Sequence, residues 1–263
     1  MGAELVRGRT TKILVLNPNS SKAMTDGLKP VIDSIDLSYS TEIHTYTGPS
    51  SAPASINDAH DLVRSNTAVL VDLEASYPSG MNYDGAVIAC FSVHPLVNNM
   101  QNDIKYPRAV AGIFEASVLT ALSLLRPGET WGIVTTGKFW EKNLADGVSS
   151  FLGADASIQQ SKFAGVESTG LNASDFHHGV DPAVVHQKLK EATKRLLSKG
   201  NVTCIVMGCA GMAGLEEIIR SAADEEKGEE FAYAELHVID GVRAGIMQVE
   251  QMIRHQRLRP GRS

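Results

Sequence analysis

Two cysteines, Cys90 and Cys209, are the residues best placed to do chemistry. Each ends a short apolar run that is typical of a buried strand, and each is followed by a short loop that leads into a helical pattern. Because a helix N-terminus favours the thiolate, we expect both thiols to have a lowered pKa and to exchange a proton near neutral pH. Cys204 lies inside a strand pattern, which predicts a buried structural thiol.

Two such thiols on opposite walls of a cleft would suit racemisation by two bases, in which one group removes a proton from a carbon and the other returns one to the opposite face. The charge that develops needs hydrogen-bond donors. The candidates are the backbone amides that follow the cysteines, at Phe91, Ser92, Ala210 and Gly211. We expect no cofactor and no metal, because the sequence shows no Gly-x-Gly-x-x-Gly fingerprint, P-loop or zinc-ligand spacing.

The elements that must position these thiols alternate between strand-like and helical patterns, which predicts parallel βαβ units and an α/β fold. The predicted strands are 13–16, 42–46, 86–89, 109–114, 132–135, 204–207 and 235–239. The predicted helices are 24–35 with a kink at Pro30, 55–74 capped by Ser55, 116–125, 139–151, 184–197, 213–223 and 241–255. The charged stretch 224–230 is expected to be a solvated loop.

The chain also resembles itself at a spacing of 119 residues, where 13–17 align with 132–136 and 87–90 align with 206–209. A looser third match sets 112–116 beside 237–241 at a spacing of 125. Either these are chance likenesses between strands, or the chain holds two pseudo-equivalent lobes. In the second case the lobes face each other with the carboxyl ends of their strands, where ligands bind in open parallel sheets.

We therefore expect two pseudo-symmetric flavodoxin-like lobes with the site in the cleft between them. The expected boundaries are 1–106 plus 241–256 for the first lobe, 107–240 for the second, and 257–263 for a basic tail. That tail is either a solvated terminus or a docking site for an anion.

Further polar residues lie near the predicted strand ends. Asn17 is either a turn residue or a substrate contact, and Thr135 and Thr136 either cap a helix or reach the cleft. His94 is either structural or a third acid or base. Glu115 either starts a helix or orients another site residue. His177 and His178 lie in a polar loop that is either solvated or metal-binding.

Composition limits the class of partner. Twenty-four basic residues stand against 30 acidic ones, a formal charge of −6, and no basic stripe is interleaved with aromatics. We therefore expect a small-molecule substrate and no nucleic-acid partner. The polar N-terminal stretch and the short first apolar run predict neither a secretion signal nor a membrane span, and hence a cytoplasmic protein. We expect it to form a homo-oligomer.

The motifs together resemble the hydantoin racemase branch of the aspartate/glutamate racemase superfamily over nearly the whole chain. The resemblance rests on Ile-Leu-Val-Leu-Asn17-Pro18-Asn19-Ser20-Ser21 with Met24-Thr25, Ile88-Ala89-Cys90-Phe91, Gly132-Ile-Val-Thr-Thr136, and Val206-Met207-Gly208-Cys209-Ala210-Gly211-Met212. The stretch from Cys90 to Leu96 is similar to fungal members associated with allantoin catabolism. It departs from the Gly-Asp-Pro that follows the first cysteine in bacterial hydantoin racemases, which leaves the substrate open.

This resemblance implies a cofactor-independent racemase whose catalytic thiols match Cys90 and Cys209. Its substrate-binding positions match Asn17, the loops after the two cysteines, and Thr135 and Thr136. Amino-acid racemases of the superfamily carry an acid at the first turn and a histidine after the second cysteine. Asn17 and Ala210 stand at those places here. A neutral ring such as a hydantoin or allantoin is therefore the expected substrate.

Two other functions compete with this interpretation. A lyase or isomerase is the first, because superfamily members decarboxylate malonates with one cysteine or isomerise maleate. A catalytically silent protein that binds a nitrogen metabolite is the second, because of the departure at Ser92 to Pro95. The presence of both cysteines favours the racemase over the decarboxylase.

Overall fold

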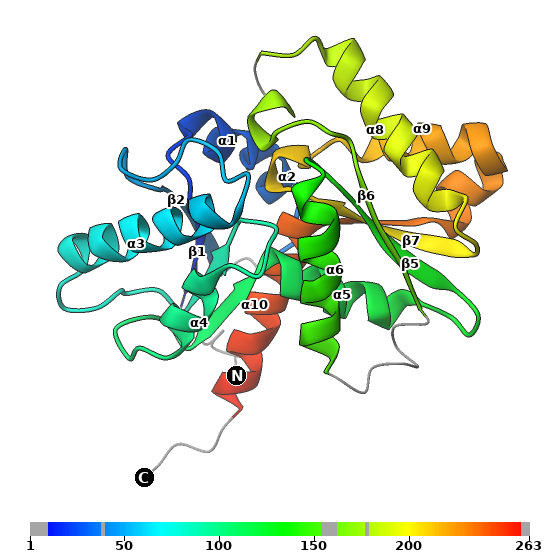
Figure 1. The fold of residues 1–263 in the computed structure, drawn as a ribbon. Coiled ribbons are helices and arrows are strands. Elements are labelled where there is room, and N and C mark those ends of the chain that lie inside the picture. The colour runs from blue at the N-terminus through cyan, green and yellow to red at the C-terminus, as the bar shows by residue number, and fades with distance from the viewer. Residues whose placement is uncertain (1–9, 38–39, 154–161, 177–178, 259–263) are drawn as a thin grey trace, which may run out of the picture.

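The computed structural model describes residues 10–37, 40–153, 162–176 and 179–258, and it contains two parallel sheets (Figure 1). The first sheet has the order β2-β1-β3-β4 and the second has the order β6-β5-β7-β8. The strands of the first are β1 (Thr11–Asn17), β2 (Thr41–Thr47), β3 (Gly85–Ile88) and β4 (Ala109–Gly112). Those of the second are β5 (Thr130–Thr135), β6 (Phe163–Ser168), β7 (Val202–Gly208) and β8 (His237–Asp240). The expected two-lobed α/β fold is confirmed.

Helices connect successive strands and cover both sheets. In the first part of the chain they are α1 (Lys22–Gly27), α2 (Lys29–Asp33), α3 (Ala59–Ser76), α4 (Pro95–Gln101) and α5 (Ile113–Leu124). In the second part they are α6 (Phe139–Leu152), α8 (Pro182–Leu197), α9 (Glu216–Lys227) and α10 (Gly241–Arg257). Three short helical turns are η1 (Ala173–Phe176), η2 (Ala210–Met212) and η3 (Phe231–Glu235).

The largest hydrophobic core lies between the two sheets and belongs to both. Helix α5 follows β4 of the first sheet but also packs on β7 and β8 of the second, while α10 follows β8 and packs on β1, β3 and β4. These two helices also pack on each other (Figure 1). Each sheet is thus covered by a helix that follows a strand of the other sheet. Neither lobe can therefore move far without breaking the shared core.

The position of β4 changes the expected lobe boundaries. Residues 109–112 were expected in the second lobe, but the structure pairs them with β3 in the first sheet. The assignment of 241–256 to the first lobe agrees with the packing of α10 on the first sheet. Residues 259–263 of the expected basic tail lie outside the described residues.

The register of the two sheets also refines the internal repeat. Val87 of β3 and Val206 of β7 are counterparts at a spacing of 119 residues. Their neighbours in the sheets are Val15 of β1 and Ile133 of β5, so the counterparts in β1 and β5 are 118 residues apart. Asn17 therefore corresponds to Thr135. The third match was wrong by three residues, since Gly112 pairs with Ile88 and its counterpart Asp240 pairs with Met207, a spacing of 128.

Local differences from the sequence prediction have simple causes. The first helix is broken at Leu28, just before Pro30, as its proline predicts. Asp58 rather than Ser55 caps α3, because its carboxylate accepts a hydrogen bond from the Asp61 amide. Strand β6 was missed because it is a half-buried edge strand without an apolar run.

The charged stretch 224–230 is not a loop, because α9 continues to Lys227. Its acids lie on the outer face of the helix. Glu225 pairs with Lys190 and Lys194 of α8, and Glu226 pairs with Lys194. The charged residues of this stretch therefore belong to the solvent-exposed face of a helix and not to a loop.

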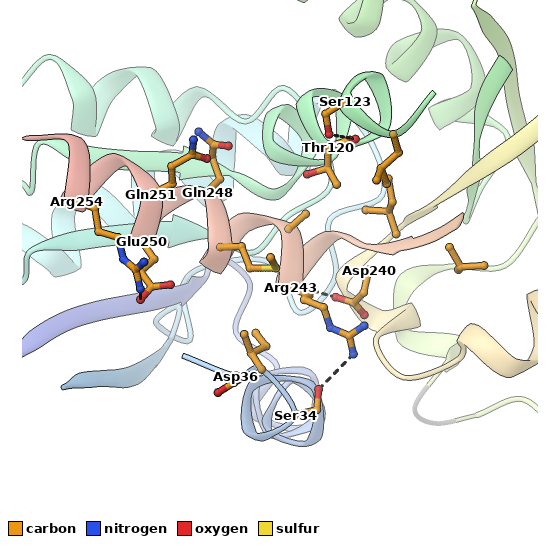
Figure 2. A pocket seen from close by; sticks show the side chains of 16 residues that line it. Ser34, Asp36, Thr120, Ser123, Asp240, Arg243, Gln248, Glu250, Gln251 and Arg254 are labelled. Carbon is orange, nitrogen blue, oxygen red and sulfur yellow. Dashed lines mark hydrogen bonds and ion pairs between the residues drawn. The ribbon is translucent and has the colours of Figure 1, made fainter. Parts of the chain in front are cut away.

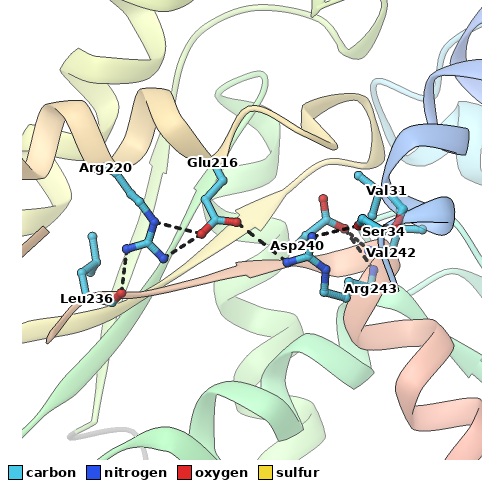
Figure 3. A network of polar contacts seen from close by, with 8 residues as sticks. All are labelled: Val31, Ser34, Glu216, Arg220, Leu236, Asp240, Val242 and Arg243. Carbon is cyan, nitrogen blue, oxygen red and sulfur yellow. Dashed lines mark hydrogen bonds and ion pairs between the residues drawn. The ribbon is translucent and has the colours of Figure 1, made fainter. Parts of the chain in front are cut away.

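A polar network ties the two lobes together beside the shared core (Figure 3). The Asp240 carboxylate caps α10 by accepting bonds from the amides of Val242 and Arg243. The Arg243 guanidinium donates to Ser34 Oγ at 3.2 Å and lies 3.9 Å from Glu216. Glu216 in turn pairs with Arg220 at 2.7 Å.

The same arginine borders a wide groove between α2, α5 and α10, with a volume of about 920 Å³ (Figure 2). Neither Cys90 nor Cys209 lines it. No described helix is long and apolar enough to cross a membrane.

We expect Gly245→Ala to lower the free energy of unfolding by about 1–2 kcal/mol, although alanine is the better helix former. A Cβ at this position of α10 would lie 2.7 Å from Val87 Cγ1 and 3.0 Å from Ile113 Cγ2, inside the shared core. Urea denaturation measures the change. The exposed neighbour substitution Gln251→Ala should stay within about 0.5 kcal/mol of the wild type. Equal stability of Gly245→Ala and the wild type would show that the core between the sheets is loosely packed.

Candidate active site

The two thiols lie at matching strand ends. Cys90 follows β3 by two residues and Cys209 follows β7 directly, and both strands are internal in their sheets. Both side chains line the same small cavity between the lobes, and both are partly buried. Cys204, in contrast, lies in β7 with an exposure of 0% and packs in the shared core, as expected.

The cavity has a volume of about 30 Å³, and the described residues of its walls carry no ionisable group other than the two thiols. Its other polar side chains are those of Asn19 and Thr136. The complete lining is Asn19, Met24, Ile56, Ala89, Cys90, Phe91, Thr136, Trp140, Ala173, Gly208, Cys209 and Ala210. Ligand pockets for small molecules usually measure 300–1,000 Å³, so wall side chains and loops must shift locally before a ring can enter.

The two sulfurs have different hydrogen-bond partners. Cys90 Sγ lies 3.3 Å from the hydroxyl of Ser92, whereas Cys209 Sγ accepts a bond from the backbone amide of Gly211 at 3.3 Å. A sulfur that accepts from a backbone N–H is stabilised as an anion, because that donor cannot turn away. Cys209 is thus better prepared to become a thiolate.

Burial dominates the acidity of both groups. It raises the pKa of Cys90 to about 12 and that of Cys209 to about 11, the latter opposed by the amides of Gly211 and Met212. The prediction that helix N-termini lower these pKa values was therefore wrong. Helix α4 begins only at Pro95, and the element after Cys209 is a turn of three residues, so neither has a full helix dipole at the sulfur.

The loops after the cysteines place the four candidate amides differently. Phe91 and Ala210 line the cavity. The Ser92 amide donates to the carbonyl of Cys90 at 3.0 Å, and the Gly211 amide is engaged with Cys209. Two of the four are thus already bonded.

Asn17 and Thr135 do not line the cavity, although Thr136 does. The Asn17 amide nitrogen donates to Asn19 Oδ1 at 2.9 Å and to Thr25 Oγ1 at 2.9 Å. Thr135 donates its hydroxyl to the carbonyl of Gly208, next to Cys209. Both side chains form hydrogen bonds that stabilise the strand ends. The bond from Asn17 also fixes Asn19, which lines the cavity.

Sequence reasoning missed seven wall residues, which come from several different segments. They are Asn19, Met24, Ile56, Ala89, Trp140, Ala173 and Gly208. Asn19 and Met24 belong to motifs that were noticed after β1, so a search of the whole strand-end turn would have found them. Ile56 lies in the loop before α3 and Ala173 begins the helical turn η1, and only the fold brings them here.

His94 has a structural position. It is the N-cap of α4, where its Nδ1 accepts a bond from the Leu96 amide at 3.2 Å, and its Nε2 lies 3.3 Å from Ser65 Oγ. Burial lowers the pKa of His94 to about 4, so the ring is neutral at physiological pH. His177 and His178 lie outside the described residues.

Among the described residues, one cluster brings three metal-ligand atoms within 4.8 Å, formed by Asp58, His60 and Asp61. Asp58 caps α3 and Asp61 accepts from the Asn57 amide, so these carboxylates serve the helix start. The cluster is separate from the thiol cavity.

Comparison with known proteins decides the family. The model of the Asp/Glu/hydantoin racemase family matches residues 13–249. The chain belongs to this family. Its fold and relatives identify it as an isomerase of the racemase type, which confirms the resemblance found in the sequence.

Similar proteins agree with this assignment. Protein C1F7.10 of Schizosaccharomyces pombe is 32% identical over 243 residues, covering 92% of both chains. A hydantoin racemase of Pseudomonas sp. strain NS671 is 29% identical, covering 92% of this chain and 86% of its own. The solved allantoin racemase from Klebsiella pneumoniae has a TM-score of 0.73 at 25% identity, covering 94% of this chain and 89% of its own.

The neutral buried His94 predicts a pH effect on the stability of this racemase. Between its folded pKa of about 4 and the usual 6.5, the unfolded chain binds a proton that the folded chain does not, so His94 makes stability fall as the pH falls. His94→Asn keeps a capping side chain but has no titrating group. From pH 7 to pH 4 the wild type should lose about 3 kcal/mol relative to this variant. Parallel stability curves would show that His94 is not buried in the neutral form.

Proposed function

We propose that this protein racemises a 5-substituted hydantoin or allantoin, using Cys90 and Cys209 on opposite faces of the ring carbon C5. The observation that carries the proposal is that two thiols at matching strand ends line one cavity, with no other ionisable group among the described residues of its walls. One thiolate would remove the C5 proton, and the opposing thiol would return a proton to the other face.

The uncharged walls support a neutral substrate. An amino acid or a malonate brings carboxylate charge, and its burial costs more free energy than that of a neutral ring, a cost that a cationic partner would lower. Among the residues that the structure describes, no lysine, arginine or histidine lines this cavity. Hydantoin and allantoin rings instead carry amide N–H and carbonyl groups, which match the side-chain amide of Asn19 and the hydroxyl of Thr136.

The high thiol pKa values fit such a substrate. A thiol with a pKa of about 11 or 12 gives a strong base once ionised, and the ring carbonyls next to C5 spread the charge that forms when the proton leaves. The backbone amides of Phe91 and Ala210 are the donors best placed to stabilise that charge, since those of Ser92 and Gly211 are engaged. This chemistry uses side chains and backbone of the chain alone.

The departure from the bacterial pattern at Ser92 to Pro95 does not by itself favour a silent binding protein. His94 and Pro95 start α4, and Ser92 contacts the sulfur of Cys90. The departure therefore lies in residues that build the loop and keep the first thiol in place. A cytoplasmic location, a role in nitrogen metabolism and assembly into a homo-oligomer stay predictions.

We expect Cys90→Ser and Cys209→Ser each to lower racemisation of allantoin, followed by polarimetry, by at least about a hundredfold. Both variants should fold, because a serine replaces a partly buried thiol of similar size. Cys204→Ala is the matched control and should keep its activity. Full activity in either single-thiol variant would contradict the two-thiol mechanism.

Deuterium uptake from solvent then separates the roles of the two thiols. Each serine variant should exchange the C5 proton of one enantiomer preferentially, and the preference should reverse between the variants. The reason is that each remaining thiol faces only one side of the ring. Equal loss of exchange for both enantiomers in both variants would point to a single base instead. Evolution of gas from an arylmalonate would indicate the competing decarboxylase.

A further inference from the structure

Glu115 is a buried acid beside the catalytic loop with no role in the mechanism above. It lies in the first turn of α5, and its Oε2 is buried without a hydrogen-bond partner. Helix α5 begins directly after Gly112, which pairs with Ile88 of β3, two residues before Cys90. The acid is therefore positioned next to the strand that carries the first thiol.

The structure makes room for this carboxyl group. A Cβ at Gly112 would lie 2.2 Å from Glu115 Oε2 and 3.1 Å from Val97 Cγ2 of α4. Gly112 has a φ of −85° and a ψ of 151°, which any residue can adopt, so its backbone does not require glycine. The missing side chain instead leaves space for the carboxyl group beside α4, the helix that follows Cys90.

Glu115 also faces no cation among the described residues that line its surroundings. It borders a second cavity of about 440 Å³ between α4, α5, α6 and α10, and it is the one ionisable residue in the described part of that lining. The polar side chains that these elements contribute there are neutral, namely Asn98, Gln101, Ser150 and Gln248. Burial accordingly raises the pKa of Glu115 to about 7.

The surroundings of the two thiols differ. Burial is the largest cause of the raised pKa of Cys90, the hydroxyl of Ser92 opposes it, and the charges of Cys209 and Glu115 add to it. The influences on Cys209 are burial, which raises its pKa, and two backbone amides, which lower it. The hydrogen bonds of the two sulfurs also differ. Cys209 accepts a bond from a fixed backbone amide, whereas Cys90 lies next to a hydroxyl that can rotate.

We propose that Glu115 is a positioning residue that disfavours the Cys90 thiolate, so that Cys209 is the thiol that ionises to accept the C5 proton while Cys90 supplies its proton from the other side. This inference rests on the proposed function. In the first half-turnover, the C5 proton passes to the Cys209 thiolate and the Cys90 S–H proton passes to the opposite face of C5. That leaves Cys90 as the thiolate beside an anionic Glu115, the less stable form. The site returns to its starting form when Cys90 gains a proton and Cys209 loses one, either by exchange of both thiols with solvent or by conversion of a substrate of the opposite hand, whose C5 proton passes to Cys90 while Cys209 returns its own.

Glu115→Gln tests the proposal, because it removes the charge and keeps the shape. The rate at which a methanethiosulfonate modifies each thiol reports its thiolate fraction, and it needs no turnover. Cys90 is measured in a Cys209→Ser background and Cys209 in a Cys90→Ser background, both as full-length protein carrying Cys204→Ala. Above pH 7.5, Glu115→Gln should speed the modification of Cys90 several-fold and leave that of Cys209 unchanged.

The effect should disappear below about pH 6, where Glu115 is protonated in the wild type and carries no charge to remove. Glu115→Asp should restore slow modification of Cys90 above pH 7.5. Glu217→Gln, which neutralises a first-turn acid of α9, is the matched control and should change neither thiol. Thermal melts of each variant confirm folding before rates are compared.

An unchanged Cys90 rate in folded Glu115→Gln would overturn the proposal, as would equal acceleration of both thiols or an effect that persists below pH 6. These outcomes differ from failure of the proposed function, in which no hydantoin or allantoin exchanges its C5 proton whatever the thiol rates. In the active enzyme, Glu115→Gln should also change the ratio of exchange rates for the two enantiomers. A merely structural role would reduce both rates equally.

Discussion

The structure depends on the exchange of helices between two parallel sheets. Helix α5 leaves the first sheet and packs on the second, and α10 leaves the second and packs on the first, so one hydrophobic core fills the space between them. That core holds the carboxyl edges of the two sheets against each other. Because the ends of β3 and β7 meet there, Cys90 and Cys209 share a cavity although 118 residues separate them along the chain.

Burial at this junction has opposite consequences for the groups it contains. It makes the thiols weak acids and therefore strong bases once ionised, and it excludes charged side chains from the walls. It also leaves His94 neutral and Glu115 with a pKa near neutrality. A pseudo-symmetric fold thus contains an asymmetric site, because Gly112 is followed by the acid Glu115 in one lobe whereas its counterpart Asp240 is a helix cap in the other.

Sequence could predict the elements that carry strong periodicity and the residues at their ends. The strands around Cys90 and Cys209 are apolar and buried on both faces, so their patterns were clear. The alignment of the two halves of the chain was less certain. Shifting β1 by one residue against β5 still matches apolar residues with apolar residues, so only the strand pairing shows that Val15 corresponds to Ile133. Edge strand β6 and the charged end of α9 were missed because packing, not composition, decides them.

The candidate site was predictable in part for the same reason. Cys90, Phe91, Thr136, Cys209 and Ala210 follow the strand ends directly and line the cavity. Ile56, Trp140 and Ala173 come from loops and a helix whose place depends on the whole fold. The pKa of a buried thiol depends on surroundings that no local pattern encodes, which is why the expected direction was wrong.

The measurement that tests the central claim most directly is solvent deuterium exchange by the wild-type protein, followed by proton NMR over a panel of allantoin, 5-substituted hydantoins, aspartate and glutamate. The account predicts loss of the C5 proton signal for allantoin or a hydantoin, with both enantiomers formed. It predicts no exchange at Cα of the two amino acids, whose charges have no partner in the cavity. Exchange of aspartate or glutamate, or of none of the compounds, would contradict it.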